Sequence, residues 1–279
     1  MQWITKRLLI WGTTYPEFSK KYYETVCTGA IDEETGRLIR IYPLTLRHLE
    51  NPPSLYSRIV AEVARNTSDL RPESYRINQQ SIRIIGRLDT KDGWLLRRQH
   101  VLRPGNVFPS VRALLDAQAA DRTSLGLVQP GRILRVYARR RTETERAEWI
   151  AHRDAALANR DLFVDVDTKV KDLVLPGVEY RLKFTCADDT CPTEHDMSIL
   201  DWGAYVLSRK VFAKSGAAKA ERDVVAHIES CLDLAKRDSY LFLGNSPAHP
   251  RSFMVVGLFY PPRVHVVHAE PSPQLSLLP

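Results

Sequence analysis

Alternating apolar and polar residues predict short β-strands through the first ninety residues. In the clearest of them, Ile59, Ala61 and Val63 fall on one side of the strand. A glycine in the last strand, Gly86, is typical of a bulge or a barrel corner. The predicted strands cover residues 7–12, 24–32, 36–44, 55–66 and 81–90.

Five strands at this spacing favour a small closed barrel of the OB kind. The remainder mixes strands with helices of amphipathic pattern, of which residues 217–238 form the clearest. We therefore expect an α+β fold that is mainly β. Its predicted parts are an OB-like barrel with a linker helix (1–120), a second β-rich domain with helices and a Cys/His loop (121–270), and a loose tail (271–279).

Composition narrows the class of protein. Hydrophobic residues make up 44% of the 279 positions and charged residues 26%, which is ordinary for a globular protein. Apolar runs are all shorter than the roughly 20 residues of a membrane span, and the start of the chain lacks the features of a signal peptide. Four cysteines are too few for a disulfide framework. We expect a cytoplasmic protein without a membrane partner.

The net charge of +7 arises from 29 arginines and 11 lysines against 33 acidic residues. Arginine binds phosphate with two parallel hydrogen bonds and stacks on bases, so this bias favours a nucleic-acid partner. A GC-rich genome, which favours arginine codons everywhere, is the competing explanation.

The most chemically informative segment holds Cys186, Cys191 and His195 within ten residues. Thiolates and imidazole are the ligands that zinc prefers, and such a site more often holds a loop in place than catalyses. A structural zinc needs a fourth ligand. The candidates are His249, which we favour, and Cys27, Cys231 and Asp196. The alternative is a polar loop with free thiols.

Residues 14–25 form a polar, aromatic connection after the first strand. On a strand, Glu24 shares a face with Tyr22 and Val26, where a carboxylate acquires a raised pKa and can act as acid or base. Tyr15, Lys20 and Tyr22 lie close enough in the chain to contact a bound nucleic acid together. The alternative is a solvated carboxylate, or an ion pair between Glu24 and a neighbouring lysine.

The dense charges of residues 69–76 form a second candidate. Arg71 and Arg76 can hold phosphate while Glu73 or Asp69 contacts a base or a sugar hydroxyl. A salt-bridged surface turn is the alternative. Three consecutive arginines at 139–141 cannot all face one groove of a strand, so at most part of that run contacts a phosphate track.

A third candidate joins Asp201 and Trp202, beyond the Cys/His loop, to the polar loop near residues 244–251. Asp201 is a candidate catalytic carboxylate, and Trp202 can stack on a base. Asn245 can contact a base edge and Arg251 a phosphate. The alternative for the tryptophan is a place in the core.

Missing motifs exclude several activities. The chain has neither a Walker loop, nor G-x-G-x-x-G, nor G-x-S-x-G, nor the paired motif of zinc deaminases. Residues 163–169 resemble the D…D-x-K core of a metal-dependent nuclease, but they lack an upstream acidic partner.

The chain contains the segments TTYPEFSKKYYETVCTGAI, GRLIRIYPL, DLRPESYR, SLGLVQP, YRLKFTCADDTCPTEHDMSILDWG and LFLGNSPAHPRSFMVVGLFYPP. In combination, these segments resemble a poorly characterised family of bacterial and archaeal proteins, with dual OB-like domains, that is associated with antiviral defence. The Cys/His spacing here is C-x4-C-x3-H, one residue longer before the histidine than that family's pattern.

The resemblance implies foreign or modified DNA as the partner. One chemistry that suits the residues is excision of a modified base by an N-glycosylase, which needs a carboxylate and a pocket for a flipped base but no catalytic metal. Glu24 or Asp201 would supply the carboxylate. Tyr15, Trp202, Arg71 and Asn245 would surround the base. The competing classes are a non-catalytic single-strand reader that recruits an effector, and an enzyme acting on free nucleotides.

Overall fold

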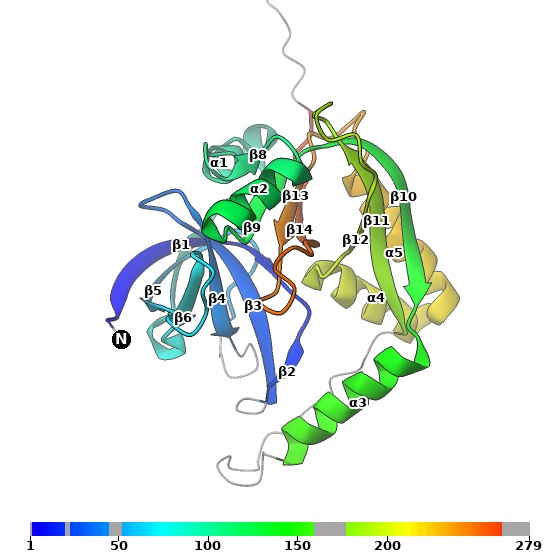
Figure 1. The fold of residues 1–279 in the computed structure, drawn as a ribbon, viewed down its shortest axis with the longest axis horizontal. Coiled ribbons are helices and arrows are strands. Elements are labelled where there is room, and N and C mark those ends of the chain that lie inside the picture. The colour runs from blue at the N-terminus through cyan, green and yellow to red at the C-terminus, as the bar shows by residue number, and fades with distance from the viewer. Residues whose placement is uncertain (1, 20–22, 45–51, 159–176, 264–279) are drawn as a thin grey trace, which may run out of the picture.

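The structure is a computed structural model that describes residues 2–19, 23–44, 52–158 and 177–263. For residues 17–19, 23, 24 and 157 it describes the backbone alone. The fold is α+β and mainly β, as the sequence predicts, with a closed barrel in the N-terminal region (Figure 1).

Five strands close the barrel in the order β1-β3-β4-β6-β5-β1. Neighbours are antiparallel except β4 and β6, which are parallel. Counted within the barrel, this is the order first-second-third-fifth-fourth of an OB fold. The short strand β2 (Glu17–Ser19) pairs with β3. The barrel strands are β1 (Ile4–Thr13), β3 (Tyr23–Asp32), β4 (Leu38–Leu44), β5 (Ser57–Arg65) and β6 (Ser74–Ile77).

The fifth barrel strand is not the predicted one. Residues 81–90 contain β7 (Arg83–Arg87), which pairs with β5 alone and whose five residues are all exposed. The barrel is closed by β6, four residues that lie between the predicted strands 55–66 and 81–90. Sequence alternation could not separate the two, because β6 is too short to show a period and β7 alternates without being buried. The register shift opposite Gly86 confirms the predicted bulge.

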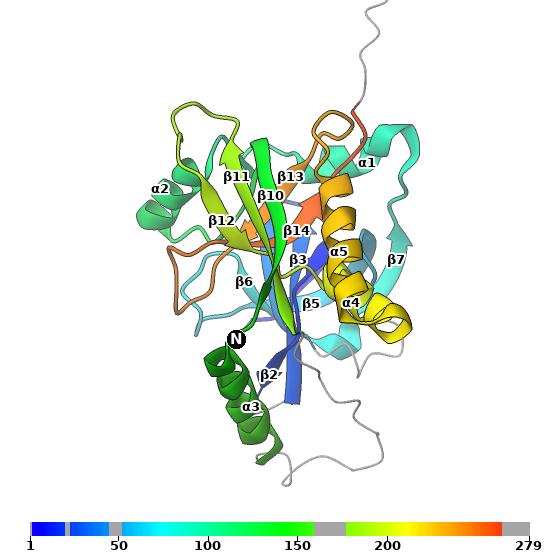
Figure 2. The same ribbon diagram turned by 90° about the vertical axis from the view of Figure 1, so that its right-hand side faces the viewer.

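The rest of the chain forms two smaller sheets and most of the helices (Figure 2). One sheet has the order β14-β13-β9-β8 and the other β10-β11-β12. The strands are β8 (Val107–Phe108), β9 (Leu125–Val128), β10 (Pro130–Arg140), β11 (Val178–Cys186), β12 (His195–Ser198), β13 (Tyr240–Gly244) and β14 (Met254–Phe259). The helices are α1 (Lys91–Val101), α2 (Val111–Asp121), α3 (Glu143–Ala158), α4 (Trp202–Ser215) and α5 (Ala217–Cys231), with a 3₁₀ turn at Gln79–Ser81.

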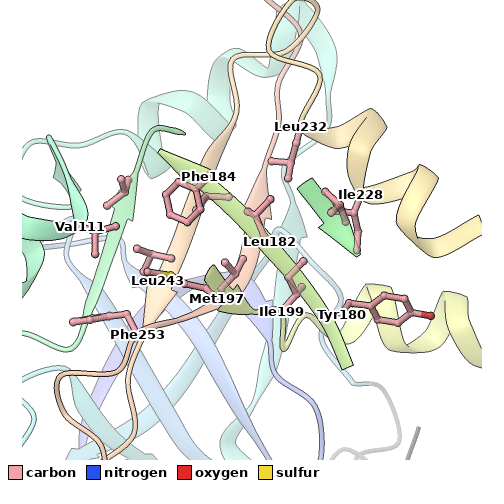
Figure 3. Packing of buried hydrophobic residues seen from close by; sticks show 14 of the residues in the cluster. Val111, Tyr180, Leu182, Phe184, Met197, Ile199, Ile228, Leu232, Leu243 and Phe253 are labelled. Carbon is pink, nitrogen blue, oxygen red and sulfur yellow. The ribbon is translucent and has the colours of Figure 1, made fainter. Parts of the chain in front are cut away.

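The two smaller sheets and the helices together are called the second region below. Strand β11 shows how this second region obtains its core. Its residues alternate between buried and half-buried, so Tyr180, Leu182 and Phe184 face inward. Ile228 of α5 and Leu232, which follows that helix, belong to the same core. Figure 3 shows these side chains between the sheet and the helices.

A second core joins the barrel to this region. Trp11, on the outside of β1, stacks on Phe242 of β13 with ring centroids 3.9 Å apart and planes 6° apart. Trp11 can lie over β3 only because position 29 is a glycine: a Cβ on Gly29 would be 2.1 Å from the indole ring. Leu9 and Ile31 are buried in the same cluster. The outer barrel face made by β1, β3 and β4 is therefore covered by protein.

Within the described parts of the chain, every helix is too short or too polar to cross a membrane.

Candidate functional site

A cavity of about 640 Å³ lies where the loop after β1 meets the second region. Its walls come from that loop, the end of β10, α3, β11, the start of α4 and the loop between β13 and β14. Residues as far apart in the sequence as Tyr15 and His249 therefore meet at this cavity. The lining residues are Tyr15, Pro16, Arg141, Trp149, His152, Val178, Glu179, Tyr180, Ile199, Leu200, Asp201, Ala204, Tyr205, Ser208, Ala248 and His249.

Backbone pairing fixes Asp201 in this cavity wall. The segment before α4 runs beside β14, with the Leu200 N–H donating to the Val255 carbonyl (2.8 Å). On its other side, the Tyr15 N–H donates to the Leu200 carbonyl (3.0 Å), and Thr14 forms an antiparallel bridge with Asp201. The loop after β1 is therefore held against the residues that precede α4.

The carboxylate of Asp201 is also the N-cap of α4. Its Oδ1 accepts a hydrogen bond from the Ala204 N–H at 2.9 Å, a usual role for aspartate at a helix start. Burial raises the pKa of Asp201, and the hydrogen bonds from the Ala204 and Gly203 backbone do not cancel that effect. A buried carboxylate with a raised pKa is suited to proton transfer.

Aromatic rings form much of the cavity wall. The Tyr15 and Tyr205 rings meet edge to face, with centroids 4.1 Å apart, and Trp149 of α3 lines the same cavity. Burial raises the pKa of Tyr15, Tyr205 adds to the shift, and the charges of Arg141 and Arg209 oppose it. The Tyr180 hydroxyl lies 3.0 Å from the Ser208 hydroxyl. Such walls suit a flat, partly polar ligand.

The cavity brings together some predicted site residues and omits others. Tyr15, Asp201 and His249 all line it. Trp202 begins α4, with its ring 5.4 Å from that of Tyr205, but it is not part of the lining. Lys20 and Tyr22 lie outside the described residues, and so does the nuclease-like segment 163–169. Glu24 lies in β3, and only its backbone is described.

Arg71, predicted to bind nucleic acid, lies instead in a polar network between the barrel and the second region. It forms a close ion pair with Asp69 (2.6 Å) and donates to the Asn245 carbonyl (2.7 Å). Glu73 accepts from the backbone N–H and the hydroxyl of Ser124 at 2.9 and 2.7 Å. These charges already have partners within the protein.

The same network contains Asn245 and the deeply buried Arg40. Arg40 is only 4% exposed and donates to the Ser124 hydroxyl and to the Asn245 carbonyl. The Asn245 side-chain amide donates to the Pro250 carbonyl at 2.6 Å. Asn245 therefore stabilises its own loop, and it is not among the residues that line the cavity.

The two remaining predicted nucleic-acid ligands lie on the surface. Arg76 is exposed and donates to Asn66 and Ser68 of the same hairpin. Arg251 is exposed in the loop between β13 and β14. The structure places neither of them in the cavity wall.

The Cys/His loop forms a compact cluster at the far end of β11. His195 Nε2 lies 3.4 Å from Cys186 Sγ and 3.3 Å from Cys191 Sγ, and all three ligand atoms lie within 4.8 Å of one another. Tetrahedral zinc, with bonds of about 2.3 Å to sulfur and about 2.0–2.1 Å to nitrogen, separates such ligands by about 3.5 Å. The three side chains therefore fit a metal ion.

The second region supports this cluster from α2. The Val111 N–H, at the start of that helix, donates to Cys186 Sγ at 3.3 Å. Burial raises the pKa of Cys186 to about 11, so without a cation its thiol stays protonated at neutral pH. A bound metal would hold the β11–β12 hairpin and contact a ligand anchored to α2.

The fourth-ligand candidates from the sequence are elsewhere. His249 lines the cavity, and Asp196 is bound to Tyr137 and Arg181 on the outer face of the sheet. Cys27 lies in the barrel strand β3, and Cys231 ends α5 beside His227. Local spacing found the three ligands, but nothing in the sequence shows that the loop carrying His249 turns toward the cavity.

Sequence reasoning missed several cavity residues. Tyr205 lies one helical turn after Asp201, a spacing that could have revealed a shared face once a helix was expected there. Trp149 and His152 lie one turn apart on α3, so they also share a face. Arg141 was considered only as part of a charge run. No local pattern shows that these segments converge.

Two sequence-family models match nearly the whole chain. A family described as a domain of unknown function, DUF8758, matches residues 4–103. A second domain of unknown function, DUF8757, matches residues 107–277, more than half of the chain. The chain belongs to the DUF8757 family. No curated protein matches the sequence significantly. The first matched region supplies Tyr15 and Pro16 to the cavity, and the second supplies all its other lining residues.

Proposed function

We propose that this protein is a DNA N-glycosylase that removes a modified base from foreign DNA in prokaryotic antiviral defence. The observation that carries the proposal is the position of Asp201, a half-buried residue whose carboxylate has a raised pKa, in the wall of a cavity of about 640 Å³ lined by aromatic rings. A cavity of this size is within the range of about 300–1,000 Å³ typical of small-molecule sites. The antiviral role rests on the sequence resemblance alone.

The chemistry requires a pocket for a base turned out of the DNA stack. Tyr15, Tyr205 and Trp149 provide rings against which a base can pack. The bond between the base and C1′ of the sugar breaks as positive charge develops on the sugar ring. The ionised Asp201 stabilises that charge and accepts a proton from the water that adds to C1′. Asp201 returns that proton through solvent to the departing base, so the base leaves protonated and an abasic site with a hydroxyl on C1′ remains.

The fold also bears on the competing proposal, a non-catalytic reader of single strands. OB barrels commonly bind oligonucleotides on the face of their second and third strands. Here those strands are β3 and β4, and their outer face includes Ile31 and Leu38, which are buried under the second region. This favours the cavity over the barrel face as the ligand site.

The metal in this proposal is zinc, bound by Cys186, Cys191 and His195. Its role is structural: it holds the hairpin between β11 and β12. The base-excision chemistry proposed for Asp201 does not involve it.

The test is to incubate the purified protein with DNA from a base-modified phage and with unmodified DNA. Released bases would be measured by mass spectrometry and abasic sites by alkaline cleavage. We expect release from modified DNA that disappears in Asp201→Asn and persists in Asp223→Asn, a matched change in a surface ion pair of α5. Glu24→Gln tests the other candidate carboxylate. Binding without release would overturn the proposal in favour of a reader.

A further inference from the structure

We infer that Arg141 forms a phosphate-binding subsite in the cavity, which would hold a phosphate beside the nucleotide whose base is bound. The inference rests on the proposed function for the identity of the neighbouring base, but not for the anion itself. It begins with the different positions of three consecutive arginines.

Arg139, Arg140 and Arg141 have separate environments. Arg139 is paired with Glu145 and Glu179, each at 2.6 Å, so its charge is neutralised within the protein. Arg140 is exposed. Arg141 is half-buried, lines the cavity and is held by a backbone hydrogen bond from its N–H to the Gly177 carbonyl (3.2 Å). Only one member of the run therefore faces the ligand space.

The Arg141 side chain lacks a counter-charge among the described residues. Its Nε is buried without a hydrogen-bond partner there, and the ion pairs of the described residues do not include it. Of the two acidic residues in the cavity wall, Glu179 already accepts from Arg139, Arg181 and Ser198. The other, Asp201, caps α4.

A half-buried guanidinium whose buried Nε–H has no hydrogen-bond partner loses solvation without compensation, and a ligand anion would supply the missing contact. Guanidinium binds phosphate through two parallel hydrogen bonds, which makes arginine the usual residue for this contact. The cavity then offers aromatic rings for a base, a carboxylate for the sugar carbon and a cation for a phosphate. These are the three parts of one nucleotide.

The experiment measures binding by calorimetry with four probes: inorganic phosphate, a deoxynucleoside, its 5′-monophosphate and a short single strand. We expect the monophosphate to bind about 10- to 100-fold more tightly than the nucleoside, as for a hydrogen bond to a charged group. Arg141→Gln should abolish that difference without changing nucleoside affinity. Arg140→Gln, the exposed neighbour, should preserve it. On the single strand, Arg141→Gln should lower the slope of log affinity against log salt by about one.

Equal affinities for nucleoside and monophosphate would overturn the inference. Equal losses in Arg141→Gln and Arg140→Gln would overturn it as well, since they would indicate a general effect of charge. Thermal melting verifies that each variant folds, and Arg141→Lys, which keeps the charge, should retain part of the phosphate preference. Arg141-dependent nucleotide binding without base release would support the subsite and contradict the glycosylase. Base release by Arg141→Gln with an unchanged KM would support the glycosylase and contradict the subsite.

Discussion

Two polar assemblies lie between the barrel and the second region, and they differ in how their charges are satisfied. In the network of Arg40, Asp69, Arg71 and Glu73, partners within the chain meet the charged groups. In the cavity, Asp201 is half-buried with a raised pKa and Arg141 keeps a buried nitrogen without a partner among the described residues. The first assembly holds the two regions together, and we propose that the second keeps its charge for a ligand.

The largest effect expected from this contrast is on activity. Asp201→Asn keeps an N-cap side chain but removes the charge, so base release should fall by about 10²–10⁴-fold with little change in melting temperature. Asp201→Ala also removes the cap and should cost about 1 kcal/mol of stability as well. A variant Asp201→Asn with full activity would reduce Asp201 to a capping residue.

In the network that contains Arg71 and Asp69, a substitution should lower stability and leave activity unchanged. Arg71→Met leaves the half-buried Asp69 without its ion-pair partner, which should lower the free energy of unfolding by about 3 kcal/mol. Activity per folded molecule, measured well below the melting transition, should stay near that of the wild type. Denaturant unfolding gives the first quantity and the base-release assay the second. A loss of activity without a loss of stability would show that the network belongs to the site.

The cluster of Cys186, Cys191 and His195 should affect stability through a bound metal ion. A metal present at 100 times its Kd stabilises the folded state by about 2.7 kcal/mol, equivalent to about 5–10 °C in Tm for a chain of this size. We expect native mass spectrometry to show one zinc ion, absent in Cys191→Ser. Chelation should lower Tm in the wild type and not in that variant. An unchanged Tm with chelator would contradict a structural metal.

The smallest effects are two opposite dependences of stability on pH. Burial alone would raise the pKa of Asp69, but the hydrogen bonds from Arg71 and Ser74 lower it below its usual value. Ionised Asp69 therefore stabilises the fold above about pH 4, and that contribution disappears as pH falls through the lowered pKa. Asp69→Asn should cost about 1.5–3 kcal/mol at pH 7, with the difference shrinking in acid.

The contribution of Asp201 to stability changes with pH in the direction opposite to that of Asp69. Because its pKa is raised in the folded state, its contribution is fully present below about pH 4 and is lost as pH rises through the raised value. Asp201→Asn should therefore gain stability relative to the wild type as pH increases. Unfolding curves of both variants between pH 3 and 8 measure the two trends, and parallel curves would show that the aspartates share one environment.

Local patterns were sufficient for much of the fold. The predicted strands 24–32, 36–44 and 55–66 overlap β3, β4 and β5, and the three metal-ligand candidates are close in the chain and in space. Helix α1 is not among the elements that the sequence predicts, and its first turn is irregular, because Asp92, Gly93 and Trp94 have left-handed backbone angles. The regular part of the helix follows that turn.

The cavity could be predicted only in fragments. Asp201 and Tyr15 were both identified, but their meeting depends on the pairing of the loop after β1 with residues 199–201, which no local pattern reveals. Conversely, Arg71 and Glu73 are residue types that suit a phosphate site. Only the structure shows that Arg71 instead donates to the Asn245 carbonyl and that Glu73 accepts from Ser124. The division into parts at residue 120 stays a prediction, because the barrel and the second region share a core.

The stack of Trp11 on Phe242 limits how this chain can be dissected. Cutting between the two matched regions would leave Trp11 and Leu9 exposed on one fragment, and Phe242 and Leu127 on the other. We expect each half alone to aggregate and the two to complement each other when produced together. The barrel is therefore not expected to fold when it is fused to an unrelated domain. Such a domain would need a sheet with an aromatic ring that stacks on Trp11 where it lies over Gly29.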